Sequence, residues 1–254
     1  SLGDVMTRKL SILVPSRGRP ESISRLWHAV IATAERPTEI EIRVRLDDDD
    51  PTRARYPLIT ATSTRFAPIV YTRGPRIRLA ASWNEQAEQA AAAGATHLAL
   101  WGDDNIPVTQ GWDRILLDRL EVDGPGFVYA RDGVWDHTYD TKVPGQLVLP
   151  TAVVMPVEVY RALGWVSAPG LTHLCIDVAW RDLGVAADCL HFEPSVFVRH
   201  FHRCAGAPDD QTYRDANDDG AQVRADNRAL TAWKASPDFD RCVSALKALR
   251  GVRT

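Results

Sequence analysis

Two adjacent acidic side chains at the end of an apolar segment are the residues of this chain with the clearest capacity for chemistry. Residues 98–107 run through apolar side chains to Trp101, break at Gly102 and then present Asp103 and Asp104. This order predicts a buried strand that ends in a tight turn, and open α/β sheets bind ligands at the carboxyl ends of their strands. Adjacent carboxylates repel each other unless a positive charge lies beside them. A divalent cation, an arginine or plain solvation could therefore surround this turn.

A basic loop follows the first predicted strand. Residues 10–14 form a short apolar run that Pro15 ends, and the loop at 16–19 then carries Arg17 and Arg19. A proline follows at the first position of a predicted amphipathic helix. Helix N-terminal amides and arginines attract anions, so this loop is a candidate anion site, although both arginines could instead face water.

The second predicted strand leads into another acidic turn. Residues 40–46 alternate apolar and charged side chains, which predicts a strand with one solvent-exposed face that carries Glu41, Arg43 and Arg45. The strand runs into four consecutive aspartates that begin at Asp47. These carboxylates could form a solvated turn, or they could accept hydrogen bonds from a nucleotide base or ribose.

The rest of the pattern predicts an α/β fold, with a mostly parallel mixed sheet flanked by helices, because strands alternate with helices in the first half. Further strands are expected at 68–71, 97–101, 127–130, 151–155 and 196–202, the last with His200 and His202 on one face. Helices are expected before Gly94, after Thr109 as N-cap, at 157–163, at 174–183 closed by Gly184, and at 221–233 and 239–249. These elements predict an α/β domain at 1–203, which would carry the candidate site, and a helical C-terminal extension at 204–254 that packs on it.

Composition narrows the class of protein. The 254 residues carry a formal net charge of −3, so the protein as a whole is not basic in the way that many nucleic-acid-binding proteins are. Arginines are nevertheless concentrated locally between residues 53 and 78. The apolar runs are too short to span a bilayer. Four cysteines without a CxxC pair predict reduced thiols in a cytoplasmic protein. The sequence leaves the oligomeric state open.

Several of these segments together resemble the GT-A nucleotide-sugar glycosyltransferases of the large family-2 type, which have a Rossmann-like nucleotide-binding sheet. Pro15, Ser16 and Arg19 match the family's strand–Pro-Ser/Thr-x-x-Arg start, in which Arg17 replaces the more usual aromatic residue. Asp47 matches the first acid of its Asp-Asp turn, which recognises the base. Arg78 and Asn84 match its Arg-x-x-Ala-x-x-Asn helix start. The resemblance implies that these residues bind the donor.

The same resemblance assigns the two central acids and a base. Asp103 and Asp104 match the variant metal motif with consecutive acids, in which the first contacts ribose and the second binds the metal. The segment DVAWRDLG resembles the family's Asp-x-x-x-Arg helix after the acceptor loop, so Asp177 would be the base that deprotonates the acceptor hydroxyl. The family's Glu-Asp pair slightly earlier is replaced here by Leu174 and Cys175.

The implied cofactor is Mn²⁺ or Mg²⁺, held by Asp104 against the diphosphate of the donor. A histidine ligand would favour Mn²⁺, and either His200 or His202 could supply it. His202 is favoured because the end of its strand lies nearer solvent and phosphate. Both histidines could also be ordinary polar residues.

The resemblance therefore implies a metal-dependent, inverting glycosyltransferase that uses a nucleotide diphosphate sugar, with a UDP-sugar favoured. The acceptor could be a glycan, a small molecule or a nucleic-acid base. A sugar-phosphate nucleotidyltransferase is an alternative, but its Gly-rich basic signature is absent from SRGRPES. A non-catalytic nucleotide- or carbohydrate-binding module is another, and it would not require Asp177.

Overall fold

The structure is a computed structural model that describes residues 8–59, 66–134, 149–202, 214 and 220–251. Its strands are β1 Leu10–Ser16, β2 Ile40–Asp47, β3 Ile69–Gly74, β4 His97–Leu100, β5 Asn105–Pro107, β6 Phe127–Arg131, β7 Val153–Pro156 and β8 Leu190–His200. Its helices are α1 Pro20–Thr33, α2 Arg55–Ile59, α3 Arg78–Ala92, α4 Trp112–Asp123, α5 Val157–Leu163, α6 Ile176–Ala186, α8 Gly220–Lys234 and α9 Pro237–Gly251.

The strands form one mixed sheet in the order β3-β2-β1-β4-β7-β6-β8-β5, which confirms the predicted fold class. Strands β3, β2, β1 and β4 are parallel, so their carboxyl ends lie at one edge of the sheet. Strand β7 is antiparallel to both β4 and β6, and β5 is antiparallel to β8. The parallel half is therefore the part of the sheet that can gather the predicted site residues.

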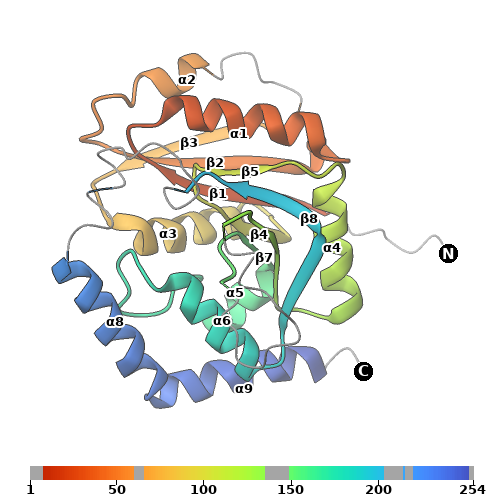
Figure 1. The fold of residues 1–254 in the computed structure, drawn as a ribbon, viewed down its shortest axis with the longest axis vertical. Coiled ribbons are helices and arrows are strands. Elements are labelled where there is room, and N and C mark those ends of the chain that lie inside the picture. Colours follow the sequence, from red (N-terminus) through yellow and green to blue (C-terminus); the bar gives the residue numbers. More distant parts are fainter. Residues whose placement is uncertain (1–7, 60–65, 135–148, 203–213, 215–219, 252–254) are drawn as a thin grey trace.

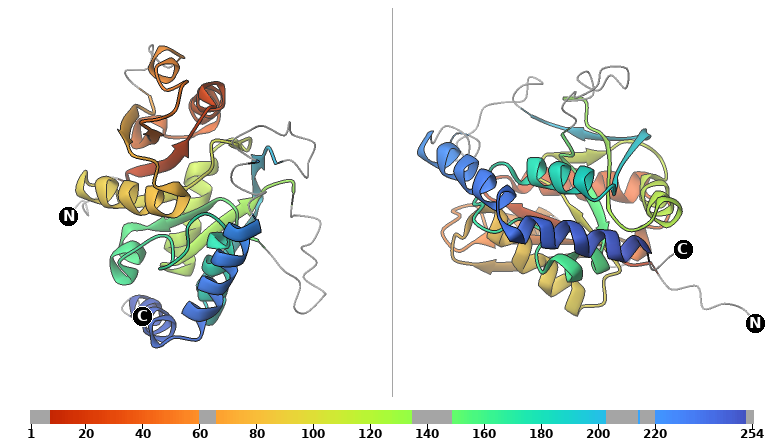
Figure 2. Two further views of the ribbon diagram at one scale, coloured as in Figure 1. Left: turned by 90° about the vertical axis from the view of Figure 1, so that its left-hand side faces the viewer. Right: turned by 90° about the horizontal axis from the view of Figure 1, so that it is seen from below.

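Helices cover both faces of the sheet and bury two apolar cores (Figure 1). Helices α1, α2 and α4 pack on one face, where Leu26 and Trp112 are fully buried. Helices α3, α5, α6, α8 and α9 pack on the other face. The C-terminal helices belong to this second core, since Trp233 and Leu246 are buried in it, and they lie far from α1 (Figure 2).

The predicted solvent-exposed face of β2 is wrong. Glu41, Arg43 and Arg45 are all buried, because helix α3 covers the face on which they lie. Glu41 and Arg43 form an ion pair, with Arg43 Nε 2.6 Å from the Glu41 carboxylate, and Ser11 Oγ also donates a hydrogen bond to that carboxylate at 2.6 Å. Burial of a charge is tolerated only with such partners. An alternating pattern can thus describe a strand that is buried on both faces.

Three predicted boundaries are also wrong. Thr109 is not the N-cap of α4, because Gly111 holds that position with φ of 72° while Thr109 Oγ1 accepts the Phe197 N–H at 2.8 Å. Gly184 does not end α6, which continues to Ala186. Instead Gly184 lets α6 approach the sheet, since a Cβ there would lie 3.0 Å from Leu190 Cβ. The last strand starts at Leu190 and ends at His200, so His202 lies beyond it.

An irregularity in the pairing of β6 with β8 sets which side chains of β8 face the site. Ala130 pairs with Glu193, but the next residue, Arg131, pairs with Phe197. Residues 194–196 of β8 therefore have no partner on β6. Such bulges bend a strand and redirect its side chains.

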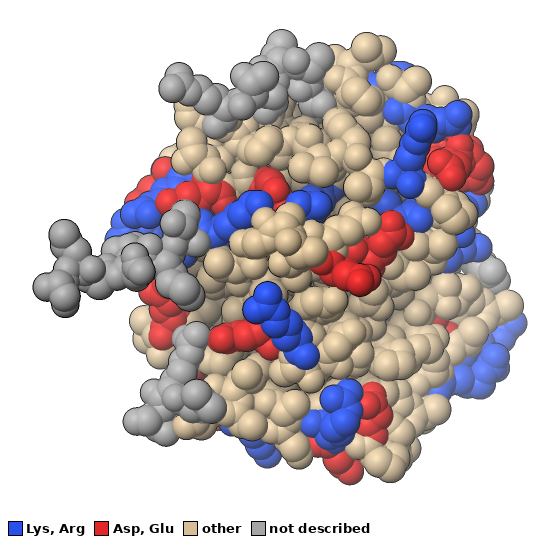
Figure 3. Space-filling model, turned by 180° about the vertical axis from the view of Figure 1, so that it is seen from behind, with Lys and Arg blue, Asp and Glu red and all other residues tan. Residues whose placement is uncertain are grey.

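Charges of both signs occur on the face seen from behind, where groups of Lys and Arg side chains lie near groups of Asp and Glu on a mostly uncharged surface (Figure 3). Within the described ranges, no helix has the length and apolarity needed to cross a bilayer.

Candidate active site

A cavity of about 310 Å³ lies at the carboxyl ends of β1, β2 and β4, and the start of α6 closes one side of it. The structure brings eleven of the twelve sequence-predicted site residues to its wall. These are Pro15, Ser16, Arg17, Arg19, Asp47, Arg78, Asp103, Asp104, Asp177, His200 and His202. They meet because parallel strands end at the same edge of the sheet.

Asp103 is buried at the base of the cavity and is held by the loop after β1. Ser16 Oγ donates to its carboxylate at 2.6 Å, and Arg19 Nη1 donates at 3.0 Å. Burial raises the pKa of Asp103 to about 6 against the opposing charge of Arg19, and the adjacent Asp104 adds to the increase. The buried Tyr56 hydroxyl supports this loop, since it lies 3.0 Å from Ser16 Oγ and accepts the Arg19 N–H at 3.0 Å. Sequence reasoning missed Tyr56, which lies on the unpredicted helix α2.

Asp104 faces a histidine that comes from β8. His200 Nε2 lies 3.5 Å from Asp104 Oδ2, and His200 Nδ1 lies 3.7 Å from Asp132 Oδ2. Burial lowers the pKa of His200, but the two carboxylates outweigh it and raise the pKa to about 9. Asp132 is itself fixed, because Thr151 Oγ1 donates to it at 2.7 Å and its carbonyl accepts the His200 N–H at 2.9 Å. His202 lies close by, with its ring centroid 5.0 Å from that of His200.

Asp104 and His200 together fit a divalent cation that would take its other ligands from outside the chain and would replace the proton on His200 Nε2. Their 3.5 Å separation is near the distance of roughly 3 Å between neighbouring ligands of an octahedral cation with bonds of about 2.1 Å. No group of three or more His, Cys, Asp or Glu in the described ranges could hold a metal alone. A carboxylate oxygen with an imidazole nitrogen suits Mn²⁺. Gly102 leaves room for this arrangement, since a Cβ there would overlap Asp104 Oδ1.

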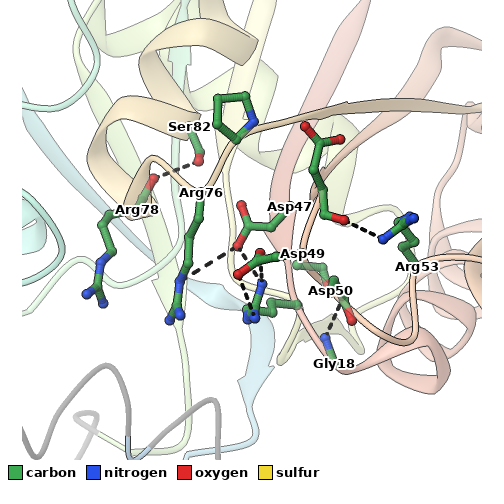
Figure 4. A network of polar contacts seen from close by, with 12 residues as sticks. Gly18, Asp47, Asp49, Asp50, Arg53, Arg76, Arg78 and Ser82 are labelled. Atoms are coloured by element: carbon green, nitrogen blue, oxygen red, sulfur yellow. Dashed lines mark hydrogen bonds and ion pairs between the residues drawn. The ribbon is translucent and has the colours of Figure 1, made fainter.

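Asp47 lies at the centre of an arginine cluster on the other side of the cavity (Figure 4). Arg17 and Arg45 approach its carboxylate at 3.3 and 3.1 Å, and Arg76 lies 3.9 Å away. Arg76 and Arg78 extend side by side from the start of α3. The cluster therefore offers one carboxylate and several guanidinium groups, as recognition of a base beside phosphates would require.

Arg78 occupies a strained backbone position at the cavity. Its φ is 69°, a left-handed conformation that costs a residue with a Cβ about 1 kcal/mol. Ser82 Oγ donates to the Arg78 carbonyl at 2.6 Å, which anchors this first turn of α3. Such strain at the wall of a cavity is typical of a residue whose side chain must point toward a ligand.

Asp177 lies in the first turn of α6 and lines the cavity. Burial raises the pKa of its carboxyl group, although the Val178 N–H donates to it at 2.8 Å and favours the ionised form. A carboxylate with a raised pKa is a stronger base than an exposed one. The preceding Cys175 has a φ of 64° and turns the chain sharply into the helix.

Asn84 is the predicted donor-binding residue that the structure does not bring to the cavity. Its Oδ1 accepts the N–H groups of Val166 and Ser167 at 2.8 and 3.0 Å. The side chain therefore fixes the loop that leads toward α6, so its part in the site is indirect.

Asp226 of α8 fixes the same loop nearer the site, and sequence reasoning missed it. It is fully buried and accepts the N–H groups of Thr172, His173 and Leu174 at 2.9, 3.1 and 2.8 Å. Nothing in the sequence marks Asp226, in the middle of a predicted helix, as the acceptor of a backbone N–H group that lies 52 residues earlier in the chain.

No protein-family model and no curated protein sequence matches the chain. Its fold, however, is similar to known glycosyltransferase structures. The mannosyltransferase PcManGT from Pyrobaculum calidifontis, in complex with GDP-Man and Mn²⁺, aligns with a TM-score of 0.65 at 14% identity over 96% of this chain and 70% of that one.

Two further structures share the fold. TarS 1-349 from S. aureus, in complex with UDP-GlcNAc, aligns with a TM-score of 0.56 at 9% identity over 89% of this chain and 71% of that one. Glucosyl-3-phosphoglycerate synthase from Mycobacterium tuberculosis, in complex with UDP, aligns with a TM-score of 0.56 at 12% identity over 92% and 80%. The chain therefore has the GT-A fold of nucleotide-sugar glycosyltransferases.

Proposed function

We propose that the protein is a metal-dependent glycosyltransferase that moves a sugar from a nucleoside diphosphate sugar, with a uridine nucleotide favoured, to an acceptor hydroxyl. One observation carries the proposal: Asp104 with His200, the arginine cluster around Asp47, and Asp177 all line a single cavity. The ligands named for the structural neighbours, GDP-Man, UDP-GlcNAc and UDP, support the donor class.

In this proposal, side chains at the carboxyl ends of the parallel strands bind the donor. Asp47 accepts hydrogen bonds from the base, Asp103 from the ribose hydroxyls, and Arg19 and Arg78 attract the phosphates. Asp104 and His200 hold the divalent cation. When bound, the cation neutralises the negative charge that develops on the diphosphate leaving group.

Asp177 acts in this proposal as general base. Its carboxylate takes the proton of the acceptor hydroxyl while the oxygen attacks the anomeric carbon and the nucleoside diphosphate leaves from the opposite side. This single displacement inverts the anomeric configuration. The surrounding wall of Leu79, Trp83 and Trp180 excludes water from the reacting atoms.

A thermal-shift screen tests the donor and metal assignments. A ligand that binds only the folded state raises the apparent melting temperature. We expect UDP to stabilise the protein with Mn²⁺ present and to lose this effect in excess EDTA. Asp104→Asn should also remove the Mn²⁺ dependence, whereas Asp240→Asn, an exposed position on α9, should keep it. An equal shift with UDP in EDTA would refute the metal assignment.

Turnover separates the enzyme from a binding module. Release of UDP from a UDP-sugar, followed with an acceptor found by a broad screen, should require both Mn²⁺ and the cavity residues. Donor binding without any transfer or hydrolysis would instead support a non-catalytic module. Chromatography of the product against both anomeric standards would then report inversion or retention.

A further inference from the structure

The end of strand β8 and the residue that follows it carry an arginine and two phenylalanines. Phe197 and Arg199 alternate with Val198 and His200 along β8, so they lie on the opposite face of the strand, and Phe201 lies with them because the Arg199 guanidinium is over its ring. Arg25 of α1 and Arg131 at the end of β6 extend this group. These five residues are called the arginine–phenylalanine surface below.

The guanidinium groups of this surface are stacked on its aromatic rings. The Arg25 and Arg199 guanidinium carbons lie 5.5 and 5.7 Å from the centroid of the Phe201 ring. The guanidinium carbons of Arg131 and Arg199 lie 5.6 and 5.7 Å from the Phe197 ring. Stacking orients a planar guanidinium and leaves its N–H edges available, which favours bidentate contacts to phosphate.

Arg25 and Arg199 carry the positive charge of this surface on which the inference rests. Arg25, Arg131 and Arg199 are exposed, and no carboxylate in the described ranges pairs with Arg25 or Arg199. In contrast, Arg17 and Arg45 of the cavity are both paired with aspartate. The exposed guanidinium groups therefore complement an anionic partner.

The position of Phe201 connects the surface to the cavity. Its N–H donates to the Asp104 carbonyl at 2.9 Å, and its ring is 38% exposed. The residues on either side of it, His200 and His202, both line the cavity. The surface therefore lies on the opposite side of the segment that forms this part of the cavity wall, and its end at Phe201 adjoins the rim of the cavity.

We propose that the arginine–phenylalanine surface binds single-stranded nucleic acid and delivers a nucleotide of it to the cavity as acceptor. Alternation of arginine with aromatic side chains suits a chain of phosphates and stackable bases, whereas a phosphate polymer without bases gains nothing from the rings. This inference deepens the proposed function and rests on it. The binding test below uses no donor, so its failure leaves donor binding and transfer to another acceptor intact.

Fluorescence anisotropy of a labelled single-stranded oligonucleotide of about 16 nucleotides, the size that a small binding domain can cover, tests the surface. The variants are Arg25→Gln with Arg199→Gln, and Phe201→Leu. The control, Arg228→Gln with Lys247→Gln, removes the same charge from exposed positions on α8 and α9. Circular dichroism melting of each variant checks that it remains folded.

The arginine double variant should bind about tenfold more weakly, with a slope of log K against log salt that is about 1.4 smaller, or about 0.7 per lost phosphate contact. Phe201→Leu should weaken binding about fivefold through lost stacking, while the control should bind like the parent. Equal weakening in the control would overturn the inference. So would the absence of parent binding, or displacement by an equal charge of inorganic polyphosphate together with normal affinity of Phe201→Leu.

Discussion

The contact between Asp226 and the loop before α6 gives the sharpest prediction. The fully buried carboxylate accepts three backbone N–H bonds and a fourth from Gln222 Nε2 at 3.1 Å. Oδ2 receives the N–H groups of His173 and Leu174, and Oδ1 receives that of Thr172. In Asp226→Asn one of these oxygens becomes an NH₂ group, which cannot accept.

The best orientation of the asparagine keeps its oxygen at the Oδ2 position. The Thr172 N–H and the Gln222 side-chain amide then both face an NH₂ group and lose their acceptor, while the two remaining bonds, from His173 and Leu174, lose the charge of the acceptor. Hydrogen bonds to a charged group contribute about 1.5–3 kcal/mol each, and neutral ones about 1 kcal/mol. We expect the free energy of unfolding to fall by about 3 kcal/mol. Asp240→Asn should change it by less than about 0.5 kcal/mol, because that side chain is exposed.

Urea unfolding followed by tryptophan fluorescence measures this loss, since Trp233 of α8 packs against Trp165 with ring centroids 5.5 Å apart. The loop also leads into Asp177, so transfer should fall at saturating donor while the UDP-induced thermal shift persists. An unfolding midpoint equal to that of the parent would refute the energetic reasoning. A large loss of stability with normal transfer would refute the claim that Asp226 positions the base.

Three other substitutions test separate features. Gly102→Ala should reduce the Mn²⁺-dependent thermal shift with UDP, because a Cβ there would displace the Asp104 carboxylate; an unchanged shift would remove Gly102 from the metal site. Asp177→Asn should lower transfer by roughly a hundredfold while UDP binding persists, and near-parent turnover would reject the general base. Glu41→Gln should destabilise the protein at neutral pH: burial raises the pKa of Glu41, but hydrogen bonds from Ser11 and Arg43 outweigh it and lower the pKa. The ionised Glu41 carboxylate therefore stabilises the folded protein fully above the pKa of an unfolded glutamate, about 4.3, and this stabilisation is lost as the pH falls through the lower pKa of Glu41 in the folded protein. The urea midpoints of the parent and of Glu41→Gln should therefore converge in acid and remain apart at higher pH.

The sequence predicted the parts of the site that depend on strand ends. Asp47 follows a segment of alternating apolar and charged residues, and Asp103 follows an apolar run and Gly102; both patterns indicate a strand and the edge at which it ends. Arg17 and Arg19 follow for the same reason, because their loop leaves β1 at that edge. The agreement therefore comes from local patterns whose spatial meaning is set by the topology of a parallel sheet.

The sequence could not predict contacts that depend on which helix covers which surface. Glu41 and Arg43 follow the pattern of an exposed face, and only the packing of α3 makes them a buried ion pair. Asn84 and Asp226 are polar residues on helices, and their backbone partners belong to a loop that comes much later or much earlier in the chain. Nearly every residue type has a backbone N–H group, so the residue types in the loop do not show which side chain accepts its hydrogen bonds.

The irregular pairing of β8 has a consequence for how this site could change. Because residues 194–196 have no partner on β6, an insertion or deletion of one residue there that keeps the pairing on both sides changes only the length of the bulge. The pairing of Asn105 with His200 then still holds His200 on the side of the cavity and Arg199 on the opposite face of the strand. The chain can therefore vary in length beside the cavity without changing which side chains of β8 line it.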